Sequence, residues 1–110
     1  MINDTIAAIA TPLGEGGLAV IRLSGADANV IAGKCFKPIG PNSKSPPDAP
    51  SHTLHYGKIT DSGRDIDEIL LAVLKAPRTF TREDTVEITC HGGLLAAQSV
   101  LKAVLAAGAR

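Results

Sequence analysis

One arginine in an otherwise apolar run restricts how this chain can fold. Arg22 is the only charged residue in Leu18–Leu23, and such a run of apolar, partly β-branched side chains is typical of a buried strand. Leu18 and Val20 share a strand face with Arg22, so we expect both faces to be buried. A buried guanidinium must be paired or bound to a ligand. A structural ion pair, or an edge strand on which the arginine reaches water, fits the pattern equally well.

A second strand-like run, from Asp84 to Cys90, carries the opposite charge. Alternation places Val86, Ile88 and Cys90 on one face, which suits a core, and Glu87 on the other face between two threonines. Taken alone, Glu87 is most simply an exposed carboxylate. Together with Arg22, it suggests either an ion pair between two strands or two walls of a polar ligand site.

The remaining pattern alternates short strands with two helices. Strands are expected over residues 5–10, 18–23, 53–59, 65–74 and 84–90, and helices over 26–36 and 94–107. Residues 11–17 and 76–83 are expected to be loops, and so is the segment 37–51, which contains five prolines. The last helix ends at a glycine two residues before Arg110, where a further strand could begin. We therefore expect a domain taken from a longer protein.

Charge and cysteine content exclude several classes of protein. Eleven basic residues balance eleven acidic ones, which is unlike a main nucleic-acid-binding surface. No apolar run has the length of a membrane span, and no signal peptide is recognisable, so we expect a cytoplasmic protein without a membrane partner. The two cysteines, Cys35 and Cys90, are expected to be free thiols.

Other candidate sites are weaker. The glycine-rich segment 14–17 leads into a strand, so no helix N-terminus follows it to hold a phosphate. Gly92 and Gly93 do precede a helix, and their N–H groups could receive an anionic oxygen, although a tight turn is the simpler interpretation. The histidines and cysteines lack the close spacing of a zinc site, and adjacent Cys90 and His91 point to opposite strand faces. We expect neither a metal site nor a catalytic residue in these residues.

Two long blocks carry a family resemblance. The segments DTIAAIATPLGEGGLAVIRLSG, at 4–25, and APRTFTREDTVEITCHGG, at 76–93, resemble the N-terminal domain of the tRNA modification GTPase family MnmE, also called TrmE. The resemblance covers nearly the whole chain, and the proline-rich segment is its least similar part. Two positions depart from the family pattern: Leu13 stands where a second proline is usual, and Arg82 stands where a glycine is usual.

The resemblance implies a fold and a ligand. It implies that residues 1–110 form a single α+β domain, a mixed β-sheet of about five strands with two helices packed on it, similar to the tetrahydrofolate-binding domain of aminomethyltransferases. Such a domain forms a homodimer and binds 5-formyltetrahydrofolate or another tetrahydrofolate derivative near the dimer contact. The family's folate contacts correspond to Arg22 and Glu87 here, and His91, Gly92 and Gly93 are further candidates to shape the pocket. A further basic contact of the family lies beyond Arg110, so weak folate binding is expected.

The resemblance also implies what the full-length protein does. The family hydrolyses GTP with a separate G domain that uses Mg and K, and acts with the flavoprotein MnmG. Together they add a carboxymethylaminomethyl-type group to C5 of the wobble uridine, U34, of certain tRNAs. The 110 residues contain no P-loop, so on this view they are a non-catalytic folate-binding and dimerisation module. The alternatives are a pure homodimerisation module, with a structural Arg22–Glu87 ion pair and no ligand, and, less favoured, a stand-alone aminomethyl-transfer enzyme.

Overall fold

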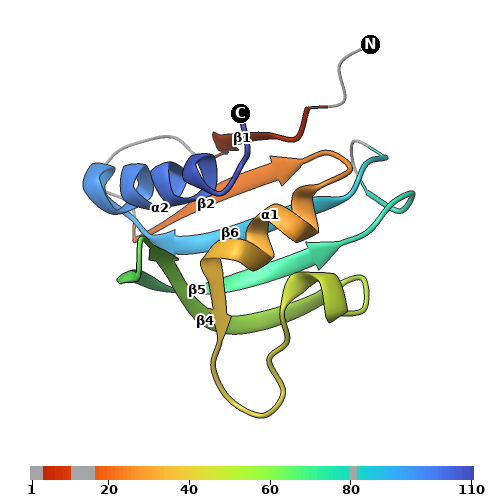
Figure 1. The fold of residues 1–110 in the computed structure, drawn as a ribbon, viewed down its shortest axis with the longest axis horizontal. Helices are drawn as coiled ribbons and strands as arrows, with labels where there is room; N and C mark the ends of the chain where they lie inside the picture. The colour runs from red at the N-terminus through yellow and green to blue at the C-terminus, as the bar shows by residue number, and fades with distance from the viewer. Residues whose placement is uncertain (1–3, 11–16, 80–81) are drawn as a thin grey trace.

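The fold is built on one antiparallel sheet. The computed structural model describes residues 4–10, 17–79 and 82–110. The strands lie in the order β1-β2-β6-β5-β4-β3, and every described pairing is antiparallel (Figure 1). The elements are β1 (Ile6–Ile9), β2 (Leu18–Ser24), α1 (Ala28–Cys35), β3 (Phe36–Pro38), the 3-10 turn η1 (Pro46–Asp48), β4 (Thr53–Asp61), β5 (Arg64–Leu74), β6 (Thr85–His91) and α2 (Leu94–Ala106).

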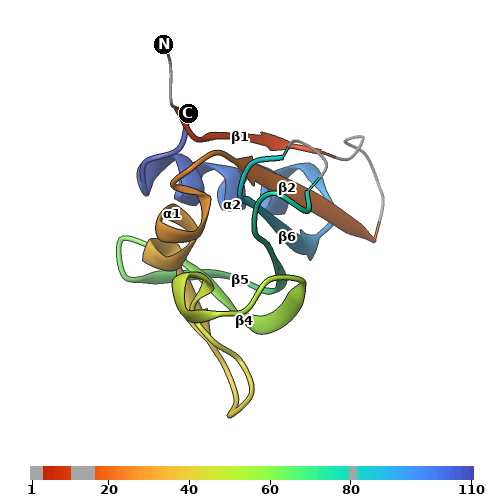
Figure 2. The same ribbon diagram turned by 90° about the vertical axis from the view of Figure 1, so that its right-hand side faces the viewer.

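The two helices cover the same face of the sheet (Figure 2). Alternate residues of the central strands point at them and are fully buried, among them Ile21, Leu71 and Ile88. Small side chains such as Ala32 of α1 and Ala97 of α2 let the helices approach the sheet closely. Because the chain contains only two phenylalanines, one tyrosine and no tryptophan, this core consists mainly of aliphatic side chains.

The α+β class and the two helices are confirmed, with differences in the sheet. The sheet has six strands rather than about five, and it is antiparallel where a mixed sheet was expected. The additional strand, β3, takes in Phe36, the expected last residue of the first helix, and the start of the proline-rich segment that was expected to be a loop, and η1 occupies a later part of that segment. Gly57 of β4 makes room for β3, because a Cβ there would come within 2.4 Å of the Phe36 ring. The glycine-rich segment lies, up to residue 16, outside the described residues.

Two turns depend on left-handed backbone conformations. Ser62 and Gly63, with φ of 53° and 78°, form the two-residue connection between β4 and β5, which is the geometry that suits a tight hairpin. Arg82 has φ of 63°, a conformation that glycine adopts more readily. The arginine therefore keeps the backbone shape that the family's usual glycine favours at this position.

The two ends of the described chain meet at the outer edge of the sheet. The Arg110 N–H donates to the carbonyl of Thr5, and the Ala7 N–H donates to the carbonyl of Arg110. The Arg110 guanidinium also forms an ion pair with Asp4, at 2.5 Å. Within the described parts of the chain, neither helix has the length and apolar character that a membrane crossing requires.

Candidate functional site

Arg22 and Glu87 lie directly opposite each other on the neighbouring strands β2 and β6. The Arg22 Nε donates to Glu87 Oε2 at 2.8 Å, and Arg22 Nη2 lies 2.6 Å from the same oxygen. The antiparallel register produces this contact, because opposed side chains on one face of such a pair lie close together. The structure therefore brings together the two site residues that the sequence singled out.

The pair lies on the sheet face that the helices leave uncovered. The Arg22 side chain is 45% exposed and that of Glu87 is 30% exposed. The expectation that both faces of β2 are buried is wrong for this chain: Leu18, on the same face, is 66% exposed. A half-exposed ion pair of this kind contributes only about 0–1 kcal/mol to stability, so the fold does not depend on it.

Small residues flank the ion pair on both sides. In the register, Ala8 of β1 lies opposite Arg22, and Ala72 of β5 lies opposite Glu87. Neither methyl side chain is long enough to cover the charged groups. Glu87 Oε2 takes both contacts from the arginine, and among the described residues none donates to Oε1. The carboxylate thus keeps one oxygen for an outside donor.

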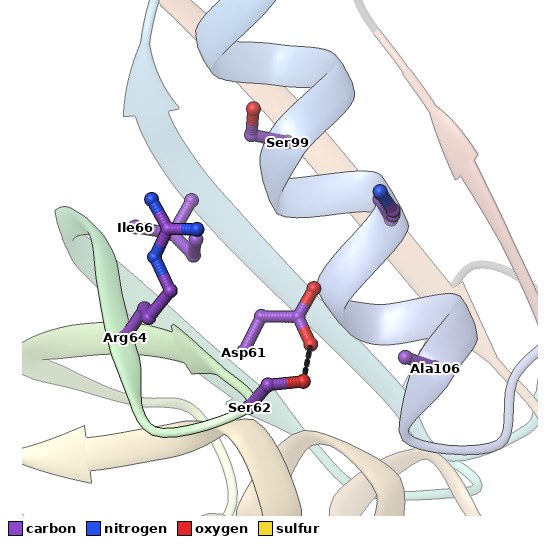
Figure 3. A pocket seen from close by; sticks show the side chains of 7 residues that line it. Asp61, Ser62, Arg64, Ile66, Ser99 and Ala106 are labelled. Atoms are coloured by element: carbon purple, nitrogen blue, oxygen red, sulfur yellow. Dashed lines mark hydrogen bonds between the residues drawn. The ribbon is translucent and has the colours of Figure 1, made fainter.

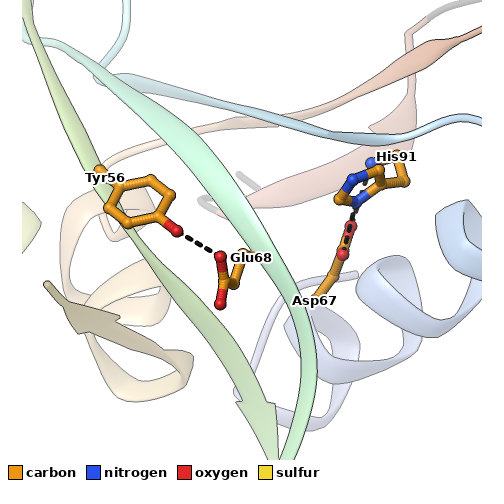
Figure 4. A network of polar contacts seen from close by, with 4 residues as sticks. All are labelled: Tyr56, Asp67, Glu68 and His91. Carbon is orange, nitrogen blue, oxygen red and sulfur yellow. Dashed lines mark hydrogen bonds and ion pairs between the residues drawn. The ribbon is translucent and has the colours of Figure 1, made fainter.

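Apolar side chains occupy much of the remaining open face. Leu70 of β5 lies beside Tyr56 of β4 and opposite Thr89 of β6 in the register, and Leu70 and Tyr56 are 47% and 41% exposed. The Tyr56 hydroxyl donates to Glu68 (Figure 4), and this hydrogen bond raises the pKa of Tyr56 above its ordinary value. Leu54 adds a further exposed side chain on β4. Such an array of apolar side chains on a sheet face is typical of a surface that meets another surface.

His91 is held by a residue that the sequence analysis missed. Asp67 Oδ1 lies 2.6 Å from His91 Nδ1, and Asp67 Oδ2 accepts the His91 N–H at 3.0 Å (Figure 4). The carboxylate favours a proton on Nδ1, and Nε2 is the ring nitrogen that points away from Asp67. His91 shares a strand face with Glu87 but lies four residues along, about 13 Å away at the usual rise of a strand. No spacing in the sequence indicates that Asp67 of β5 meets His91.

The two glycines after β6 take different positions. The Gly92 N–H donates to the Gly17 carbonyl at 3.0 Å, so it is occupied within the fold and is not free to receive an anion. Gly93, with φ of 97°, is the N-cap of α2, and its carbonyl accepts the Ala97 N–H. Gly92 therefore acts as a turn residue, and Gly93 starts the helix close to His91.

Both cysteines are buried free thiols. Burial raises the pKa of Cys35 to about 11 and also raises the pKa of Cys90. Neither thiol is poised to form a thiolate near neutral pH, and Cys90 points into the core while His91 is exposed. Among the residues that the structure describes, no three metal-binding side chains are grouped together.

Comparison with known proteins identifies the family. Residues 5–110 match the family model described as the N-terminus of the GTP-binding protein TrmE. The chain belongs to this family. It is 56% identical over 109 residues to the tRNA modification GTPase MnmE of Bacillus velezensis, 55% identical to that of Geobacillus thermodenitrificans and 54% identical to that of Bacillus subtilis.

The match covers nearly all of this chain but a minor part of its relatives. Each of these alignments includes 97% of the chain and 23% of the relative's length. The family resemblance that the two sequence blocks indicated is confirmed. The relatives' names describe proteins about four times as long, and those activities belong to the whole proteins.

Proposed function

We propose that this chain is the folate-binding and dimerisation module of a tRNA modification GTPase. The observation that carries the proposal is the Arg22–Glu87 pair, exposed on an open sheet face and flanked by alanines. A pterin ring presents a ring N–H and an amino group side by side, and one carboxylate can accept both. Glu87 has an oxygen available for this role, and Arg22 can donate to a pterin or formyl carbonyl or to the glutamate carboxylate of the folate.

His91 lies farther along the same face, in the direction that an extended folate could follow, and α2 begins three residues after it. The outward nitrogen of His91 can contact the part of the ligand beyond the pterin, while Gly93 leaves space near the helix start. The ligand is 5-formyltetrahydrofolate or another tetrahydrofolate derivative. In the longer protein it supplies the one-carbon unit for modification of the wobble uridine with MnmG, while a separate G domain binds GTP with Mg and K.

A second copy of this chain is the proposed occupant of the open face. Leu18, Leu54 and Leu70 are all exposed there, and a dimer would remove them from water next to the ion pair. The proposed folate site would then lie beside the contact between the two copies. The chain itself is proposed to have no catalytic residue.

Folate binding is tested by titrating the chain with 5-formyltetrahydrofolate up to millimolar concentration in a calorimeter. We expect weak, saturable binding to the wild type and at least a tenfold loss for Glu87→Gln, because the amide cannot accept both pterin donors. The matched control is Asp65→Asn, which removes the carboxylate of another exposed cross-strand ion pair, with Lys58 at 3.0 Å. The control should bind like the wild type.

Two results would count against the proposal. If Glu87→Gln bound folate as tightly as the wild type, Glu87 would not be the pterin contact. A wild-type chain that dimerises but shows no heat of binding at millimolar folate would instead favour the pure homodimerisation module, in which Arg22 and Glu87 form only a structural ion pair.

A further inference from the structure

A groove lies between the β4–β5 turn and the second half of α2 (Figure 3). It has a volume of about 530 Å³, within the usual size range of ligand pockets. It lies beside α2, which covers the sheet face of the buried Ile21 and Ile88, opposite to the face of Arg22 and Glu87. Ser99 and Ala106, whose short side chains face it from α2, are too small to fill the space.

The groove is positively charged at a place where the chain as a whole is neutral. Arg64 from the start of β5 and Lys102 from α2 line it, and among the described residues neither forms an ion pair. Asp61 is the one carboxylate in the lining, and its Oδ1 accepts the Ser62 hydroxyl at 3.2 Å. An adjoining hollow of about 440 Å³ shares Asp61 and Ser62 and adds Lys34.

The cations, hydroxyls and carboxylate that line the groove together restrict which anions can bind there. Two unpaired cations beside the Ser99 hydroxyl suit a phosphate group. The carboxylate of Asp61 would repel a bare phosphate, but it can accept a hydrogen bond from a hydroxyl, as acidic residues do with ribose in nucleotide sites. A ligand that fits all of these groups carries a phosphate and a sugar hydroxyl a few bonds apart.

We propose that this groove binds a ribose 5-phosphate unit, with the phosphate between Arg64 and Lys102 and a ribose hydroxyl on Asp61. The unit belongs either to a single RNA strand or to a free nucleotide. The neutral charge of the chain agrees with one local contact rather than a broad nucleic-acid surface. With one phosphate neutralised, log K should fall with log salt concentration with a slope of about −0.7 for a single strand.

The test is an NMR titration of the ¹⁵N-labelled chain with ribose 5-phosphate, 2-deoxyribose 5-phosphate, a short oligouridylate and a short oligothymidylate. We expect saturable shifts at the amides of 61–64 and 99–106, with the ribose ligands binding more tightly than their deoxy counterparts. Arg64→Gln and Lys102→Gln should each weaken binding about tenfold, since each removes a charged donor. Lys44→Gln, which removes a cation far along the chain in the proline-rich segment, should change nothing.

Asp61→Ala gives the sharpest discrimination. Loss of the carboxylate should strengthen binding of the deoxy ligand, because a repulsive charge is gone, while the preference for ribose disappears. An oligouridylate that binds at least tenfold more tightly than ribose 5-phosphate would identify an RNA strand as the source, and equal affinities would identify a free nucleotide.

The proposal is overturned if the shifts do not saturate, if they spread over all lysines alike, or if Arg64→Gln and Lys102→Gln bind like the wild type. It is independent of the folate site, because Glu87→Gln should leave these shifts unchanged. Failure of one site therefore leaves the other to be judged on its own measurement.

Discussion

The two faces of the sheet are made by the same strands but differ in their exposure to water. On the covered face, Ile21, Leu71 and Ile88 are fully buried beneath α1 and α2. On the open face, the neighbours of these residues in the sequence include Arg22 and Leu70, which are exposed, and Glu87, which is partly exposed. One residue of displacement along a strand therefore separates a stabilising position from one available for binding.

Within each strand, the residues on the covered face therefore stabilise the fold, and the residues on the open face are available for binding. Side chains on the covered face stabilise the fold because they are buried away from water, so their truncation should lower the free energy of unfolding. Residues on the open face lose little when they change, since water already reaches them. The chain can therefore vary its charged and apolar groups on the open face without loss of the core, and the following predictions test that division from the largest effect on unfolding to the smallest.

Ile88→Ala should have the largest effect on stability. Ile88 is fully buried at the centre of β6, and its truncation removes buried methyl groups and leaves a cavity against the helices. We expect a loss of about 2–5 kcal/mol in the free energy of unfolding, measured by urea denaturation.

Leu54→Ala is the matched control for that substitution. Leu54 is 67% exposed on the open face, so its truncation should cost less than about 1 kcal/mol. Similar losses for the two variants would contradict the division between the faces.

A pH dependence should arise from the buried thiol of Cys35, the last residue of α1. Burial raises the pKa of Cys35 from 9.0 to about 11, so the folded state favours the neutral thiol. Below pH 9 the thiol is neutral in both states and its contribution is fully present. Between pH 9 and 11 only the unfolded chain ionises, so the free energy of unfolding should fall, by up to about 3 kcal/mol.

The measurement is urea denaturation at several values between pH 8 and 11, in wild type and Cys35→Ala. The variant should be less stable at pH 8 but should lose less stability as the pH rises. Parallel pH profiles for the two proteins would show that Cys35 does not carry this dependence.

Leu70→Lys should change association while leaving the fold nearly intact. The lysine would place a charge within the proposed contact between two copies, but its side chain can reach water in the single chain. In sedimentation equilibrium we expect a dimer for the wild type, as proposed, and a monomer for the variant, with the unfolding free energy of the monomer changed by less than about 0.5 kcal/mol. If the variant dimerised with unchanged affinity, the open face would not be the dimer interface.

Much of the fold could be predicted from the sequence because the covered face has a strict period. The alternation of Val86, Ile88 and Cys90 identified the core side of β6, and the structure confirms that all three are buried. The short strand β3 was missed, because it ends on a proline, another proline follows it closely, and its strand conformation depends on pairing with β4 rather than on a local pattern.

The candidate site could be predicted only in part. Charges inside two strand patterns were sufficient to single out Arg22 and Glu87, yet their contact depends on a register that the sequence does not encode locally. The same patterns suggested that Arg22 would be buried, because an open face with apolar residues has the same sequence pattern as a face that packs in the core. Asp67 could not be found, since its partner His91 belongs to a strand distant in the sequence.

The meeting of the chain ends at β1 has a mechanical consequence. Tension applied between Asp4 and Arg110 would act on one ion pair and on the backbone contacts of Arg110 with Thr5 and Ala7. These few bonds can break one after another. The inner strands bear the force only after β1 has separated from β2. The first event under force should therefore be release of the C-terminal residues from the sheet edge, with the helices still packed.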